Sequence, residues 1–146
     1  MQTSTFVFVA LLMGIIVAIY LPMNSSVARY LGSSIAATVI FFAVALITSI
    51  FIFIFFGEYA SIPKIGTVPL YLYVPGFIAA FMVIGTTFLI PKIGARRFFI
   101  LLVSGQILMA IIVSHFGILE SLKDPITLKK ILGATLVIAG AFLSAS

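Results

Sequence analysis

The sequence has 146 residues, of which 64% are hydrophobic and 8% are charged, and its net charge is +5. Its mean hydropathy is +1.41. A water-soluble domain of this size cannot hide so much apolar surface, so the composition excludes a soluble protein and indicates one that resides in the lipid bilayer. The basic residues lie at the ends of the apolar segments, where they signal topology and contact lipid headgroups. Nucleic acid is therefore not expected as a partner.

Five apolar segments are candidates for crossing a bilayer, which takes about 20 residues of helix. Because lipid offers the backbone no hydrogen-bond partners, each segment is predicted to be α-helical. The opening MQTSTF carries no Lys or Arg, so the first segment is expected to be a retained helix rather than a signal peptide. The sequence thus predicts an all-α fold, a single transmembrane domain over residues 1–146 with helices at about 5–23, 33–56, 70–90, 98–116 and 131–144.

The loops between the predicted helices carry no charge bias across the membrane. An odd number of helices puts the termini on opposite sides, and Lys and Arg in cytoplasmic loops normally set the orientation. Either positions near the first helix settle one orientation, or the chain inserts both ways and forms an antiparallel homodimer. Such a dimer would present ten helices as an inverted repeat, an architecture that many transporters build by gene duplication. The side of the N-terminus receives Lys64, Lys123, Lys129 and Lys130, and the other side receives Arg29, Lys92, Arg96 and Arg97.

A polar stretch, YLPMNSSVARYLGSS at 20–34, separates the first two apolar segments. Pro22 removes one backbone hydrogen bond and frees a carbonyl, and Asn24 can both donate and accept. Arg29 is costly inside the bilayer but can snorkel to an interface. The stretch is either an interfacial turn that ends the first helix, or a broken helix lining a polar cavity. In the second case Asn24 would hydrogen-bond a substrate and Arg29 would attract or gate it.

Gln106 lies mid-way along the fourth predicted helix, where its side chain needs a polar partner. It can bond across helices as a packing contact, or it can line a transport pathway, and both readings stay open. The hydroxyls of Thr48, Ser49, Thr86 and Thr87 can bond to their own helix, so packing is favoured for them. The predicted substrate-binding residues are Asn24, Ser25, Ser26, Arg29 and Gln106.

The sequence lacks a set of residues suited to catalysis. It has no Cys, and its one His, His115, is expected to make an interfacial hydrogen bond at the end of the fourth helix. Glu58 is expected in solvent after the second helix, with a cavity-facing position as the alternative, and no acid lies in the middle of a predicted helix. No phosphate loop or HExxH spacing is present. An enzyme, a metal site, a bound cofactor and a proton-coupling acid are therefore not expected.

The last predicted helix carries small residues on one face. Gly133, Val137, Gly140 and Ser144 recur at spacings of four, three and four, which aligns them along a helix. Such a stripe favours close contact with another helix, either at a dimer seam or within one chain.

Short motifs follow one another along almost the whole chain: LPMNSSVARYLGSSIAA, PGFIAAFMVIGTTFLIPKIGA, LVSGQILMAIIVSHFGIL and KKILGATLVIAGAFL. Together they resemble the YdcZ family, a branch of the drug/metabolite transporter superfamily. The resemblance implies a five-helix half-unit and a multi-pass transporter in the bacterial inner membrane. Asn24, Arg29 and Gln106 stand at positions that match polar residues of the family pattern.

The chain departs from the pattern of its relatives in two places. Many family members have an acid just before HFG, where this chain has Ser114. The small multidrug resistance proteins, which work as antiparallel dimers, keep a membrane-embedded Glu in the first helix, and this chain has none. Both departures argue against proton-coupled export of a cation, and a cavity with Arg29 but no acid favours a neutral or anionic substrate.

These features predict a small-molecule transporter, expected to be an exporter, that works by alternating access as an antiparallel homodimer. One alternative is a non-transporting membrane subunit whose polar residues serve as helix contacts. The other is a half-transporter that needs a paralogous partner of opposite orientation.

Overall fold

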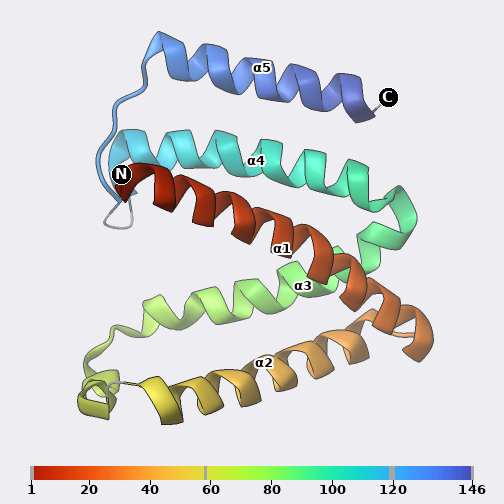
Figure 1. The fold of residues 1–146 in the computed structure, drawn as a ribbon, viewed down its shortest axis with the longest axis vertical. Helices are drawn as coiled ribbons and strands as arrows, with labels where there is room; N and C mark the ends of the chain where they lie inside the picture. The colour runs from red at the N-terminus through yellow and green to blue at the C-terminus, as the bar shows by residue number, and fades with distance from the viewer. Residues whose placement is uncertain (1, 58, 119–120, 146) are drawn as a thin grey trace. The chain divides into compact units, whose positions relative to one another are not determined.

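The computed structural model describes residues 2–57, 59–118 and 121–145. Within these ranges the chain forms helices joined by loops, without a strand, so the predicted all-α fold is confirmed (Figure 1). The chain divides into two compact units, Met1–Lys92 and Ile93–Ser146.

The first unit begins with a helical hairpin, in which α1 (Gln2–Leu31) is followed closely by α2 (Ser34–Phe56). The link needs glycine at position 32, where φ is 68°. Ser33 caps α2 by accepting a hydrogen bond from the Ala36 amide at 3.2 Å. The remaining elements of the unit are the 3₁₀ helices η1 (Tyr59–Thr67) and η2 (Leu70–Tyr73), and the helix α3 (Val74–Ile93).

The second unit is a pair of helices, α4 (Ala95–Phe116) and α5 (Leu128–Ala145), which lie side by side (Figure 1). The loop between them folds back onto the end of α4. The Asp124 amide donates to the Ser114 carbonyl at 2.8 Å, and the Ile126 amide donates to Nδ1 of His115 at 3.1 Å. These bonds fix the loop to the last turn of α4.

The structure corrects the predicted end of the first helix. α1 does not stop at residue 23 but continues through Pro22 to Leu31, so most of the polar stretch is helical and the turn is confined to Gly32 and Ser33. Pro22 has no N–H to donate to the Ala18 carbonyl, and the helix continues without this one bond. The hydroxyls of Ser25 and Ser26 donate to the carbonyls of Leu21 and Pro22 in the same helix, each at 3.2 Å, so these side chains are satisfied without a break. The polar side chains therefore project at helical spacing from one continuous element.

Four helical segments in the described ranges are long and apolar enough to cross a membrane. The predicted fifth span is not among them. α5 has 18 residues, including Lys129 and Lys130 in its first turn. It spans about 27 Å, close to the lower limit for crossing a bilayer, so a crossing by α5 stays a prediction. The four segments are Ser4–Leu31, Ser34–Phe56, Leu70–Ile93 and Ala95–Phe116.

Candidate functional site

Most of the helical surface of the first unit is apolar and exposed, as expected of helices that face lipid. A small core is buried where α1, α2 and α3 meet, and polar or small side chains make up much of it. The α1 members recur at i, i+3, i+4 and i+7, which places them on one helix face. The buried residues are Leu21, Asn24, Ser25 and Ala28 of α1, Ala37 and Thr38 of α2, and Thr86, Thr87 and Ile90 of α3.

A hydrogen bond between Asn24 and Thr87 joins α1 to α3 within this core. Nδ2 of Asn24 donates to Oγ1 of Thr87 at 2.8 Å, and the two side chains are 6% and 1% exposed. Every fully buried side-chain nitrogen or oxygen in the described ranges has a hydrogen-bond partner. An unpaired amide here would cost about 1–3 kcal/mol, so the pair stabilises the contact between the two helices.

Thr87 is a candidate site residue that the sequence analysis did not single out. Thr86 and Thr87 are adjacent and both buried, and packing was favoured for both. Oγ1 of Thr86 donates to the Met82 carbonyl of its own helix at 2.7 Å, whereas Thr87 accepts from Asn24. Because a buried amide needs a hydrogen-bond partner, the sequence indicates that some polar group contacts Asn24. That this group is Thr87 follows only from the way α1 packs on α3.

Ser26 and Arg29 are the next polar residues along α1, and they lie outside its buried face. Nη2 of Arg29 donates to Oγ of Ser26 at 3.0 Å, and the Arg29 side chain is exposed. Beside them lies a pocket of about 260 Å³, here named the Arg29–Lys92 pocket. Its wall includes Ser25 and Arg29 of α1, Ser33 and Ser34 at the start of α2, and Thr87 and Lys92 of α3.

Four of the five predicted site residues, Asn24, Ser25, Ser26 and Arg29, lie within two turns of α1 in the first unit, and the fifth belongs to the second unit. Gln106 lies on α4, in the second unit, and its side chain is exposed. Its neighbour Ser104 donates to the Ile100 carbonyl of the same helix at 2.8 Å. A role for Gln106 in binding or in helix packing remains a prediction.

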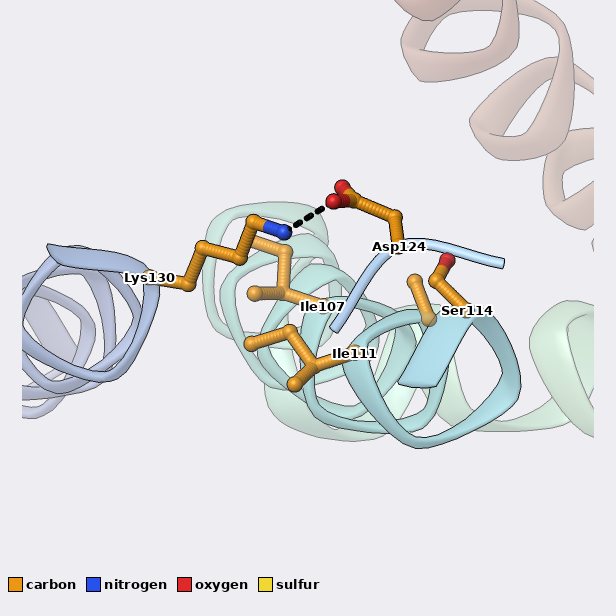
Figure 2. A pocket seen from close by; sticks show the side chains of 6 residues that line it. Ile107, Ile111, Ser114, Asp124 and Lys130 are labelled. Carbon is orange, nitrogen blue, oxygen red and sulfur yellow. Dashed lines mark ion pairs between the residues drawn. The ribbon is translucent and has the colours of Figure 1, made fainter. Parts of the chain in front are cut away.

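The second unit contains a pocket of a different kind, between the end of α4 and the start of α5. Its volume is about 210 Å³, and Figure 2 shows Ile107 and Ile111 on its floor and an ion pair between Asp124 and Lys130 above them. Nζ of Lys130 also donates to the Pro125 carbonyl at 2.8 Å. The two charges neutralise each other, so this pocket offers a mainly apolar surface.

The described residues contain no cluster of three or more His, Asp or Glu side chains that could hold a metal ion. Glu58 and Glu120 lie outside these residues. The first unit contains the buried hydrogen bond between Asn24 and Thr87 and the pocket lined by Arg29 and Lys92. Such an arrangement can bind and orient a polar molecule by hydrogen bonds and charge.

Helices of membrane-spanning length, exposed apolar surfaces and a small buried polar core define a multi-pass integral membrane protein. A family model described as "Putative inner membrane exporter, YdcZ" matches residues 5–143. The chain belongs to this family, and it is a protein of the inner membrane. Its family is one of exporters, which are transporters rather than enzymes. The comparisons with curated proteins and with solved structures gave no match.

Proposed function

We propose that this chain exports a small molecule across the inner membrane by alternating access, and that Asn24 and Thr87 lie at the centre of its binding site. The buried hydrogen bond between these two side chains is the observation that carries the proposal. A helix contact made only for packing needs no amide, because small and apolar side chains pack well in a membrane protein. Polar groups buried in membrane helices typically mark a pathway.

The chemistry of the pair suits a site that opens and closes. Asn24 has two N–H donors and a carbonyl acceptor, and one donor is used by Thr87. A substrate with a donor and an acceptor can bond to the remaining groups of Asn24, or replace Thr87 as its partner. Exchange of one partner for the other changes the contact between α1 and α3, which is the kind of two-state element that alternating access requires.

Export is tested by comparing small molecules in the growth medium of cells that express matched variants. We expect the wild-type protein and Thr86→Val to release the same compounds, because Thr86 bonds only to its own helix. Asn24→Ala is expected to release none, since it removes the amide that binds the substrate. If Asn24→Ala reaches the membrane at wild-type level and exports normally, the site assignment is wrong. If all the media are identical to that of cells without the protein, a non-transporting subunit becomes the better reading.

The working unit in this proposal is an antiparallel homodimer. The equal numbers of basic residues on the two sides support insertion in both orientations. The small-residue stripe of α5 has room for another helix, since a Cβ added at Gly133 or Gly140 would meet nothing within 4 Å. Val137, Gly140 and Ser144 line a pocket with residues of α4, so this part of the stripe serves a contact within the chain equally well, and the dimer proposal rests on the charge count.

Labelling of a single cysteine tests the two orientations. The sequence has no Cys, and Gly66 in η1 is an open position because a Cβ there meets nothing within 4 Å. In cells expressing Gly66→Cys, an impermeant thiol reagent is expected to label about half of the molecules before permeabilisation and all of them after it. Labelling of all or none before permeabilisation would mean one orientation, and a paralogous partner of opposite orientation would have to be sought.

A further inference from the structure

Two cations line the Arg29–Lys92 pocket without an acidic partner. Arg29 lies near the end of α1 and Lys92 near the end of α3, and both side chains contribute to the wall. Residues 2–57 and 59–92, the described part of the first unit, contain no Asp or Glu. By contrast, the cation of the other pocket, Lys130, is paired with Asp124. The charge of the first pocket is therefore not neutralised by the described part of its own unit.

Both cations are held in position by neighbouring side chains. Arg29 donates to Oγ of Ser26, which in turn donates to the Pro22 carbonyl. Nζ of Lys92 lies 4.0 Å from the ring centroid of Phe88, another residue of the pocket wall. A guanidinium has five N–H donors and an ammonium has three, so both groups keep donors for a ligand. Cations held in this way lose little side-chain entropy when a ligand binds.

The remaining wall of the pocket also favours negative charge. Ser33 accepts from the Ala36 amide and so keeps its hydroxyl proton for a ligand, and the start of α2 contributes Ser34. Ser25 and Thr87 also line the pocket but are almost fully buried, and the Ser25 hydroxyl donates to the Leu21 carbonyl. The first turn of a helix carries a partial positive charge, which adds to the field of the two cations. The helix start strengthens a site that Arg29 and Lys92 already define.

We propose that the Arg29–Lys92 pocket binds a phosphate group. The planar fork of an arginine matches the oxygens of phosphate, and a lysine complements it as a point charge. The phosphate can belong to a soluble molecule or to the headgroup of an anionic lipid, and the same side chains recognise either. The reading in which the phosphate is the anionic end of an exported molecule rests on the proposed function. The binding of a phosphate group to the pocket does not depend on that function.

The proposal is tested on the purified full-length protein in an uncharged detergent. The melting temperature is measured with sodium phosphate against sodium chloride of equal ionic strength, and with phosphatidylglycerol against phosphatidylcholine. A ligand that binds the native state raises the melting temperature in a concentration-dependent way. The test variant is Arg29→Gln with Lys92→Gln. The matched control is Lys64→Gln with Arg96→Gln, which removes the same charge at two exposed positions outside the pocket.

We expect the wild-type protein and the control to be stabilised equally, and the apparent affinity of the test variant to fall about tenfold or more, the loss typical of charge-assisted hydrogen bonds. Stabilisation by inorganic phosphate identifies a soluble ligand, and stabilisation by phosphatidylglycerol alone identifies a lipid headgroup. Equal stabilisation of the test variant and the control, or no stabilisation of the wild-type protein by either probe, overturns the proposal. Circular dichroism of each variant checks that the helices are intact. Arg29→Lys, which keeps the charge, is expected to retain part of the binding.

Failure of this test and failure of the export test can be told apart. Binding is measured without transport, and the phosphate site is probed by variants that leave Asn24 and Thr87 unchanged. A protein that exports its compounds but shows no phosphate-dependent stabilisation keeps the proposed function and loses the phosphate site. A protein that binds phosphate but exports nothing keeps the site and loses the transport mechanism.

Discussion

The two pockets of this protein differ in how they treat charge. In the second unit, Asp124 pairs with Lys130, and backbone bonds to Ser114 and His115 fix the loop that carries the acid. In the first unit, Arg29 and Lys92 line one pocket with hydroxyl groups and no acid. Charges that neutralise each other serve the structure of a loop, whereas charges without a partner are available to a ligand. If the proposals above hold, one pocket stabilises a loop and the other binds a ligand.

The comparison extends to the buried polar groups. The core of the first unit holds an amide–hydroxyl pair between two helices whose exposed surfaces are largely apolar. The polar groups of the second pocket lie at the end of α4, where Ser121 donates to the Val113 carbonyl at 3.2 Å and closes the loop further. A change in the first region should therefore affect both helix packing and transport. A change in the second should affect stability alone.

The largest effect on stability is expected from Thr87→Val. This change removes the acceptor of a buried hydrogen bond and leaves the Asn24 amide unpaired, so the free energy of unfolding should fall by about 1–3 kcal/mol. Thr86→Val is the matched control, because it removes a hydroxyl that bonds only to its own helix. The free energy of unfolding of both variants is measured by denaturant titration in mixed micelles. If the free energy of unfolding falls equally in the two variants, the hydrogen bond between Asn24 and Thr87 contributes no stability of its own.

A smaller effect is expected from Asp124→Asn in the second unit. The ion pair with Lys130 is partly exposed, with side-chain exposures of 33% for Lys130 and 64% for Asp124. Its loss should lower the free energy of unfolding by about 0.2–1 kcal/mol and leave export unchanged. A double-mutant cycle with Lys130→Gln isolates the pair, and the export assay supplies the second readout. A large loss of export in Asp124→Asn would break the division of roles between the two pockets.

Sequence composition was sufficient to predict the all-helical fold and residence in the membrane, because both follow from the total of apolar residues. The prediction that the first helix ends at residue 23 was wrong, because Pro22, Asn24 and two serines are residues typical of loops in water-soluble proteins. In the helix, the same serine hydroxyls satisfy their own hydrogen bonding by donating to the carbonyls of Leu21 and Pro22, so these residues do not end the helix. Local residue preferences could not decide between these outcomes.

The candidate site was predictable on α1 but not on α3. Asn24 and Arg29 stand out because their side chains are costly among apolar residues. Thr87 does not stand out, since a threonine can bond to its own helix, as Thr86 does. Lys92 was predicted as a topology signal, and its place beside Arg29 depends on how α1 and α3 come together. Pairing across helices is a property of tertiary packing.

The length of α1 has a consequence for hydrophobic matching. Its 30 residues span about 45 Å, whereas the hydrocarbon core of a bilayer is about 30 Å thick. The helix is therefore about 15 Å longer than the hydrocarbon core is thick, and tilt or extension into a headgroup layer must accommodate the excess. Arg29 lies two residues from the end of α1, whereas Asn24 lies about 7.5 Å further along the helix axis toward the apolar part. One continuous helix can thus place the guanidinium near lipid phosphates while it keeps the amide of Asn24 deeper in the protein.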